Sequence, residues 1–209
     1  MTEGLQMLVT DILKSEHQFI LQYIDLMEQY ARHDAASSSD AGTSLLLAKS
    51  ADFIEFIHDF ADTFHHAKEE DVLFKYLASP GILNECNPLP VMLREHAQAR
   101  ELLKRMQYAS SLNNIADLIS CVQGYASLLK QHIFKEDNIL YAMAERNIDE
   151  PAKLKLLDEY KNIEEIQDGQ AKTIKFQHRL SSLQSYFENQ ASLTEMHIIL
   201  EKPASDCHR

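Results

Sequence analysis

Two segments of the chain carry the same metal-ligating side chains at the same spacing. Each has a histidine followed four positions later by a glutamate, and each is preceded further up the chain by a Glu-His pair. Spacing i, i+4 places both side chains of a segment on one face of a helix, where they can hold one cation. The repeat predicts a metal site built from two related halves. The predicted ligands are His17, His65, Glu69, His96, His132 and Glu136.

Apolar residues flank these polar residues at helical spacing, as Leu13 and Leu21 flank His17. The ligand faces should therefore point into a core. A carboxylate buried there costs several kcal/mol unless it is paired, protonated or bound to a metal. Imidazole and carboxylate suit iron, zinc or manganese. Six such ligands are too many for one tetrahedral zinc and suit two metals that share bridging carboxylates, with positions left open for water, oxide or dioxygen.

The elements that must position these ligands are long helices. The hydrophobic period predicts helices over about 5–31, 44–78, 89–109 and 115–146. Ser79-Pro80-Gly81 ends the second helix, and residues 147–151 end the fourth. Because the connections are short, we expect an all-α, up-down-up-down four-helix bundle.

From Ala152 to about Gln190 the sequence remains helical in period but is more polar, with an interruption near Gly169. We therefore predict a bundle domain over 1–148 and an additional C-terminal helical segment over 149–209, whose tail from Glu201 onward is poorly ordered. In the polar segment, Glu164 and Glu165 are interpreted as surface charges.

The net charge, the apolar runs and the cysteines exclude several classes of partner and site. A formal net charge of -12 repels phosphate backbones and anionic headgroups, so neither nucleic acid nor a membrane is an expected partner. No apolar run is long enough to span a bilayer, which favours a cytoplasmic protein. The spacing of Cys86, Cys121 and Cys207 indicates neither a disulfide framework nor a zinc knuckle.

Three stretches of this sequence resemble the hemerythrin-like, HHE cation-binding family over roughly Leu8 to Arg146. They are Phe60-Ala61-Asp62 with 65–71, Met92-Leu93-Arg94-Glu95-His96, and His132-Ile133-Phe134-Lys135-Glu136-Asp137. The resemblance implies two non-haem iron ions, bridged by oxo or hydroxo groups and by carboxylates. It also implies that the protein binds or reacts with a small diatomic ligand or peroxide (dioxygen, nitric oxide or hydrogen peroxide) in oxidative or nitrosative stress or in iron handling.

The sequence departs from the oxygen-carrying hemerythrins at one ligand position. Those proteins have a second histidine four residues after the histidine of the third helix, and Arg100 stands there in this chain. One iron is then poor in ligands, which argues against reversible oxygen carriage and leaves room for an exchangeable ligand or redox chemistry. Whether the protein is an enzyme stays open; the alternative is a non-catalytic iron-binding or iron- and oxygen-sensing module, and a third hypothesis is a redox-silent zinc site.

The histidine doublet leaves a choice of register, because His66 and Glu70 are also spaced i, i+4. Aligning Leu73 with Leu140 favours His65 and Glu69. Three further residues stay open as accessories to the site. Asp137 is an alternative to Glu136, His58 could reach the rim of the site, and Tyr125 could either donate a hydrogen bond to a bound oxygen species or only pack in the core.

Overall fold

The computed structural model describes residues 8–36, 44–83 and 86–201, with only the backbone described in 194–201. The described residues form six helices and no strand. The first helix is α1 (Asp11–Ala36) and the third is α5 (Leu89–Ser111). The second helix is a continuous series: α2 (Leu45–Phe56), η1 (Ile57–His65), α3 (His66–Lys68), η2 (Glu69–Leu73) and α4 (Phe74–Leu77). The fourth comprises α6 (Ile115–Lys135), η3 (Glu136–Leu140) and α7 (Tyr141–Asn147).

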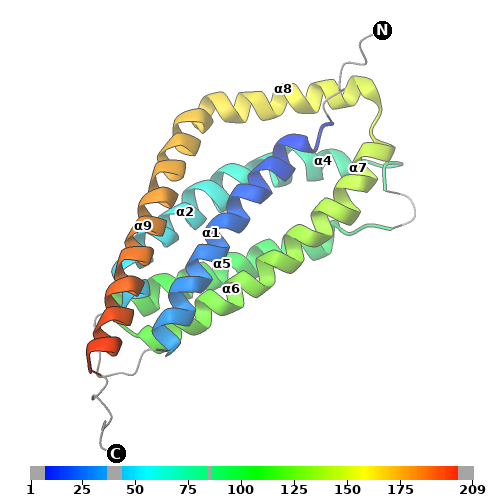
Figure 1. The fold of residues 1–209 in the computed structure, drawn as a ribbon. Coiled ribbons are helices and arrows are strands. Elements are labelled where there is room, and N and C mark those ends of the chain that lie inside the picture. The colour runs from blue at the N-terminus through cyan, green and yellow to red at the C-terminus, as the bar shows by residue number, and fades with distance from the viewer. Residues whose placement is uncertain (1–7, 37–43, 84–85, 202–209) are drawn as a thin grey trace, which may run out of the picture.

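The four helices lie side by side as an antiparallel bundle (Figure 1), which confirms the predicted all-α fold. The second and fourth helices are each capped at the N-terminus by a polar side chain. Ser44 accepts a hydrogen bond from the Leu47 amide, and Asn114 accepts one from the Asp117 amide. Such caps satisfy amides that have no partner within the helix. The first residues of the predicted first helix (5–7) and the predicted tail from 202 on lie outside the described residues.

Segments of π-helix interrupt the second and fourth helices next to the predicted ligands. In η2 the Phe74 amide donates to the Glu69 carbonyl, and in η3 the Tyr141 amide donates to the Glu136 carbonyl. The same i to i+5 pattern joins the His66 amide to Ala61 at the end of η1. A wider turn therefore occurs at equivalent places in both halves, as is frequent at functional sites.

The bundle core consists of two apolar clusters with a polar layer between them. Along α1, Leu13 belongs to one cluster and Ile20 to the other, and His17 lies between them. Along α5, Met92 and Ala99 enclose His96 in the same way. The polar layer is thus sealed above and below by apolar side chains, so bulk water has little access to it.

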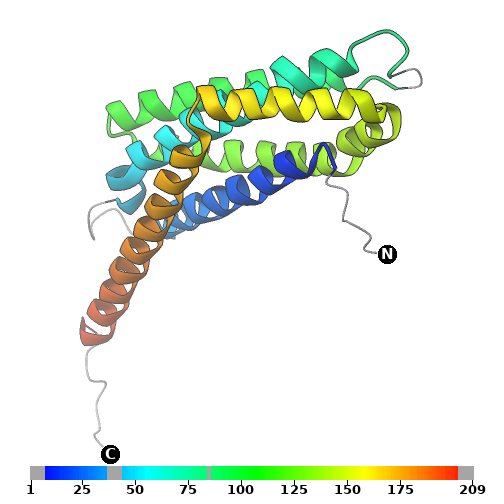
Figure 2. The same ribbon diagram turned by 90° about the horizontal axis from the view of Figure 1, so that it is seen from above.

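The C-terminal helices α8 (Glu150–Ile166) and α9 (Gly169–Glu201) form a bent arm along the outside of the bundle (Figures 1 and 2). Helix α8 contacts α3 and η2, and α9 contacts α1 and α2. Their apolar side chains enter both clusters of the core, so the arm is packed against the bundle rather than loosely attached. These side chains are Leu156, Tyr160, Phe176, Leu180 and Leu183.

The corner between α8 and α9 needs a glycine. Asp168 has a φ of 51°, and a Cβ on the next residue, Gly169, would lie 2.7 Å from the ring of Phe64. Any larger residue would push the arm away from η1. The corner between α8 and α9 therefore packs against η1, the segment that carries His65.

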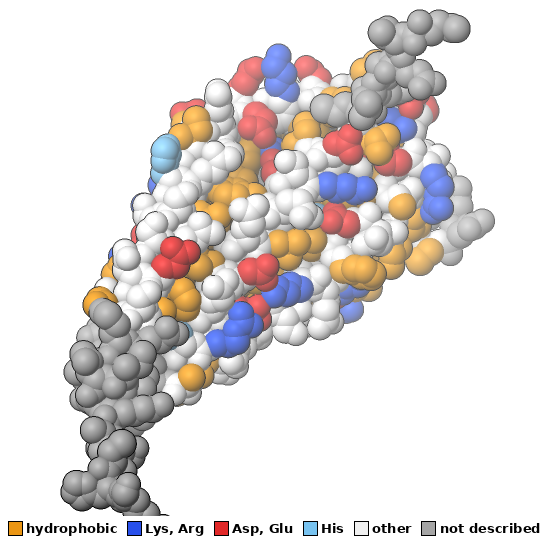
Figure 3. All heavy atoms as spheres, viewed as in Figure 1, with side chains coloured by type: hydrophobic (Ala, Val, Ile, Leu, Met, Phe, Trp, Pro, Cys, Tyr) orange, Lys and Arg blue, Asp and Glu red, His pale blue; other side chains and the backbone are white. Residues whose placement is uncertain are grey.

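Acidic and basic side chains are interspersed on the face shown in Figure 3. Within 8–36, 44–83 and 86–201, no helix combines the length and the apolar content that a membrane span requires.

Candidate metal centre

The structure brings all six predicted ligands together in the polar layer of the bundle. Helix α1 contributes His17 and α5 contributes His96, while the second and fourth helices each contribute one His-Glu pair. None of the six is more than 2% exposed. The ligand atoms of this layer form two groups, and within each group they lie within 4.8 Å of one another. His17, His65 and Glu69 form one group, and His66, Glu69, His96 and His132 form the other.

The four imidazoles form two pairs, one in each half of the site. The rings of His17 and His65 meet edge-on with centroids 4.7 Å apart, and those of His96 and His132 meet edge-on at 4.6 Å. Each pair joins a histidine of one helix to the histidine of the next, as the sequence repeat predicts. The site is thus two similar half-sites related by the repeat.

Each of the two carboxylates reaches both half-sites. Glu69 Oε2 lies 3.5 Å from His65 Nε2 and 3.4 Å from His96 Nε2. Glu136 lies 3.3 Å from His17 Nε2 through Oε2 and 3.1 Å from His132 Nε2 through Oε1. This is the placement that bridging carboxylates between two metal ions require.

The carboxylate oxygens supply a test of whether a cation fits. Glu69 Oε2 and both oxygens of Glu136 are buried and have no hydrogen-bond partner among the described residues. A buried carboxylate oxygen in this state is costly unless a positive charge compensates it. Four imidazole nitrogens face these oxygens, so the donor set is one that binds divalent transition metals. The residues present therefore fit a metal site.

Every predicted histidine ligand is held through its other ring nitrogen by a carboxylate, with Nδ1 to oxygen distances of 2.7–2.9 Å. Such contacts fix the orientation and tautomer of an imidazole and leave Nε2 free for a metal. The partners are Asp137 for His17, Glu16 for His65, Glu70 for His96 and Glu95 for His132.

Three of these four carboxylates are in turn bound by a cationic side chain. Lys68 donates to Glu16 and Lys135 donates to Glu95, which explains why a lysine recurs in both repeats. Arg100 donates to Glu70 at 2.7 Å. The sequence offered Glu70 only as an alternative ligand, and it gave Glu16 and Glu95 no role. The recurring Glu-His pairs were the signal that could have found Glu16 and Glu95.

One further histidine belongs to the polar layer. His66 is 3% exposed, and its ring stacks on that of His96 with centroids 3.7 Å apart and planes inclined by 15°. Its Nδ1 lies 3.0 Å from Asp62, which also accepts a hydrogen bond from Arg100. The sequence posed a choice between His65 and His66, but in the structure both histidines are buried in the site.

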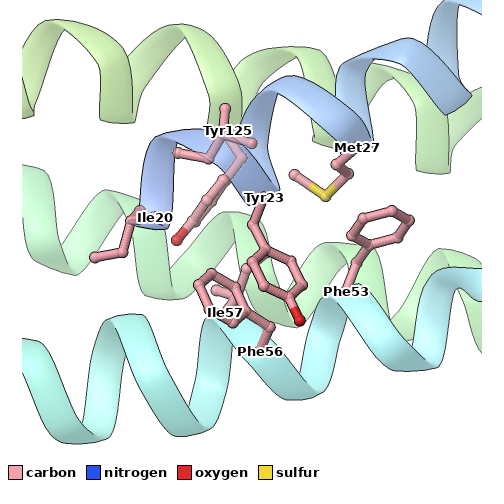
Figure 4. A pocket seen from close by; sticks show the side chains of 8 residues that line it. Ile20, Tyr23, Met27, Phe53, Phe56, Ile57 and Tyr125 are labelled. Carbon is pink, nitrogen blue, oxygen red and sulfur yellow. The ribbon is translucent and has the colours of Figure 1, made fainter. Parts of the chain in front are cut away.

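The two half-sites differ in the aromatic ring that covers them. Tyr141 stacks on His17, and its hydroxyl donates to Glu69. At the equivalent place in the other half, Phe74 stacks on His96 with centroids 5.7 Å apart. Among the residues that the structure describes, the half-site of His17 therefore has a phenol hydroxyl where the half-site of His96 has a phenyl ring. Tyr125, the tyrosine that the sequence singled out, instead lines a small apolar cavity in the core (Figure 4).

The charges of the site are strongly coupled. Burial lowers the pKa of His17, but the hydrogen bond with Asp137 and the negative charge of Glu136 outweigh burial and raise that pKa to about 10. The pKa of His96 is also raised to about 10, because Glu136 and Glu70 outweigh its burial. Burial and the nearby Glu136 raise the pKa of Glu69 to about 7. Without a metal, protons would thus supply the positive charge that these carboxylates require.

Two residues at the periphery of the site, Glu164 and His58, differ in whether they are connected to it. Glu164 is not a free surface charge: it accepts a hydrogen bond at 2.5 Å from the fully buried Lys68, so α8 is linked to the site. A distant carboxylate can pair with a buried lysine only through the tertiary fold, which periodicity does not reveal. His58 lies on the surface, where it pairs with Asp59, and it does not reach the site.

These features define a class: a helical bundle with a buried histidine and carboxylate metal site. A family model for the hemerythrin HHE cation-binding domain matches residues 8–144, which include all six predicted ligands. The chain belongs to this family. It is therefore a metal-binding helical domain of a family whose cation is typically iron. No curated protein matches the chain.

Proposed function

We propose that the chain is a non-haem di-iron protein with His17, His65, Glu69, His96, His132 and Glu136 as ligands. One observation carries the proposal: three buried carboxylate oxygens of Glu69 and Glu136 lack hydrogen-bond partners among the described residues and face four oriented imidazoles. Two imidazoles would hold each iron, and both carboxylates would span the pair. The distances of each carboxylate to both half-sites support this division.

We further propose that dioxygen, peroxide or nitric oxide is the ligand or substrate, in oxidative or nitrosative stress or in iron handling. Bound at this site, iron supplies one-electron chemistry and affinity for small diatomic molecules. The two apolar clusters exclude bulk water and larger solutes from the polar layer. Tyr141 supplies a hydroxyl donor at the edge of the His17 half-site. We also propose that the protein is cytoplasmic. Its net charge of -12 supports the proposal that it binds neither nucleic acid nor anionic membranes.

A small cavity lies in the apolar core (Figure 4). It has a volume of about 10 Å³ and is lined by apolar and aromatic residues, among them Ile20, Ile57 and Tyr125. Ile20 lies less than one helical turn beyond His17 along α1, so the cavity is close to the polar layer. Its volume is close to the minimum that a single water molecule requires, and its lining offers that molecule few polar partners.

Metal analysis and a visible spectrum test the proposal directly. We expect about two irons per chain with absorption in the visible range. His132→Ala and Glu136→Ala should each abolish iron loading, whereas His58→Ala, which changes a surface histidine of the second helix, should not. A colourless protein with one zinc, or full iron loading by the two ligand variants, would reject the proposal.

A second candidate function, a non-catalytic iron or oxygen sensor, is favoured by one chain of contacts. His65 is bound to Glu16, Glu16 to Lys68, and Lys68 to Glu164 of α8. Occupancy of the metal site could thereby alter how the arm of α8 and α9 is held. Limited proteolysis with and without iron tests this role, and equal cleavage of the arm in both states would exclude it. Oxygen evolution from added peroxide would instead favour turnover.

A further inference from the structure

A groove runs along the outside of the bundle between α1 and α9, whose courses can be followed in Figure 1. Its volume is about 750 Å³, which lies within the range of about 300–1,000 Å³ that is usual for sites that bind small organic molecules. Helix α1 forms one wall, α9 forms the other, and Phe60 of η1 also lines the groove. Because α9 lies beyond residues 8–144, which match the family model, the groove depends on the C-terminal arm of this chain.

Both walls of the groove present uncharged polar side chains at helical spacing. They are Ser15, Gln18 and Gln22 on α1 and Gln177, Ser181 and Gln184 on α9. The intervals are three or four residues on each helix, so each set lies on one helix face. Hydroxyl and amide side chains offer both donors and acceptors of hydrogen bonds. The walls therefore suit a ligand that has donors and acceptors along its edge.

Aromatic and aliphatic side chains make up the apolar part of the lining. The partly buried Phe19 meets the buried Phe60 edge-on, with ring centroids 5.1 Å apart. Leu180 adds apolar surface from α9. Aromatic rings prefer offset or edge-on contacts with one another, so a further ring can pack against Phe19. The lining therefore suits a flat, ring-containing ligand.

The charges of the groove disfavour anionic ligands. Among the described residues that line it, Asp11 and Glu16 are acidic and none is basic, in a chain whose net charge is -12. Both carboxylates already have partners: Asp11 accepts a hydrogen bond from the Leu8 amide, and Glu16 accepts one from Lys68. The groove therefore favours an uncharged ligand over a phosphate ester or a carboxylate.

Glu16 connects the groove with the polar layer of the bundle. It lines the groove and is 9% exposed, while its Oε2 lies 2.8 Å from His65 Nδ1. A single side chain thus lies between the groove and a predicted metal ligand. Neither the family match nor the six predicted ligands account for a groove in this position.

We propose that the groove is a binding site for an uncharged, planar heteroaromatic molecule. The ring of this molecule packs against Phe19, and the glutamine and serine side chains of the two walls bind its edge. The proposal goes beyond the proposed function, because binding in the groove requires no metal ion. A molecule bound there adjoins the carboxylate that orients His65, so the groove is placed for a partner molecule of the polar layer.

Equilibrium dialysis of the full-length protein against lumiflavin and against FMN tests the proposal. The two probes share a planar ring with donors and acceptors on its edge, but FMN also carries a phosphate. We expect about one lumiflavin to bind per chain, with a Kd on the order of 10–100 µM. FMN should bind at least about 10-fold more weakly, because its phosphate faces a groove without a basic residue among those described.

Ser181→Trp locates the binding site, because the indole would fill the groove. Lumiflavin should then bind at least about 10-fold more weakly, as expected when a ring contact is lost. Ser182→Trp is the matched control and should bind lumiflavin like the wild type. Both serines are exposed and donate to the carbonyl four residues earlier, but only Ser181 is among the residues that line the groove.

The proposal is overturned if the wild type binds no lumiflavin, if it binds FMN equally well, or if Ser181→Trp binds lumiflavin unchanged. Equal weakening in Ser182→Trp also overturns it, since the loss would not come from filling the groove. Should Ser181→Trp not fold, Gln22→Trp on the opposite wall takes its place. Dialysis does not depend on the metal content, so a failure here is distinct from a failure to load iron.

Discussion

The ring of Tyr141 lies parallel to that of His17, with centroids 5.4 Å apart and planes inclined by 8°, and its hydroxyl reaches Glu69. It thus touches one ligand from each of two helices. Phe74 has the corresponding place over His96 but has no hydroxyl. The two half-sites therefore have the same pair of imidazoles, but the half-site of His17 has a hydroxyl donor where the half-site of His96 has a phenyl ring.

Replacing Tyr141 by Phe should leave the fold and the iron count unchanged, because Phe74 shows that the half-sites accept a phenyl ring. Affinity for nitric oxide should fall by about 10-fold or more, since a hydrogen bond to a charged group contributes about 1.5–3 kcal/mol. Spectral titration of the reduced, iron-loaded protein measures this affinity. Tyr160→Phe is the matched control, because the Tyr160 hydroxyl is buried without a partner among the described residues. Equal nitric oxide affinity in all three proteins would remove Tyr141 from the ligand-binding site.

Glu95→Gln should weaken metal binding without removing a ligand. Glu95 orients His132 through Nδ1 and is itself bound by Lys135. Loss of such a partner typically lowers metal affinity by about 10–100-fold. Competition with a chelator of known affinity measures the change. Glu101→Gln on the same helix is the control, because Glu101 is exposed and pairs only with Lys104 among the contacts described. An unchanged affinity in Glu95→Gln would mean that the imidazole is oriented by packing alone.

The sequence predicts the bundle and the ligand layer because both depend on local periodicity. Long apolar stripes define four helices, and a repeated His-Glu spacing identifies the faces that turn inward. The repeat assigned Glu69 and Glu136 to equivalent positions, and the same wide turn follows both residues in the structure.

The surroundings of the ligands could not be predicted in the same way. Lys68 and Glu16 are residue types that usually lie on the surface, and only the approach of α1 and α8 turns them into a buried ion-pair network. The sequence left the contribution of His66 open, because two adjacent residues of a regular helix point about 100° apart. The π-helical η1 ends directly before His66, and both histidines of the doublet are buried.

Metal loading should release protons at neutral pH. The raised pKa of about 10 means that His17 and His96 are protonated at pH 7 without a metal, and ligation requires neutral imidazole. Metal affinity should therefore rise with pH up to about 10. Calorimetric titration in two buffers of different ionisation enthalpy measures the protons released. Equal heats in both buffers would show that the imidazoles are neutral before binding.

The same two groups set the pH dependence of the metal-free fold. A folded-state pKa above the ordinary value of 6.5 contributes stability that is fully present below pH 6.5 and is lost as pH rises toward about 10. The metal-free protein should thus lose thermal stability between pH 6.5 and 10, while the loaded protein is protected over this range. Melting temperatures of both forms at pH 7 and 9.5 check this. A gap between the two forms that narrows with rising pH would contradict it.

The arm of α8 and α9 should be sensitive to its corner. In Gly169→Ala the new Cβ would meet the Phe64 ring at 2.7 Å and the Glu164 carboxylate at a still shorter distance. Phe64 is buried in η1, so the corner rather than the ring has to move. We expect destabilisation by about 1–3 kcal/mol and faster proteolysis between α8 and α9.

Gly124→Ala is the matched control, because Gly124 lies within α6 and a Cβ there would make only an ordinary contact of 3.5 Å with Leu102. Alanine is the better helix former, so this variant should be more stable by about 0.5–1 kcal/mol. Urea unfolding of both variants measures the two changes, which should have opposite signs. If Gly169→Ala unfolds like the wild type and its arm resists protease equally, the arm tolerates displacement.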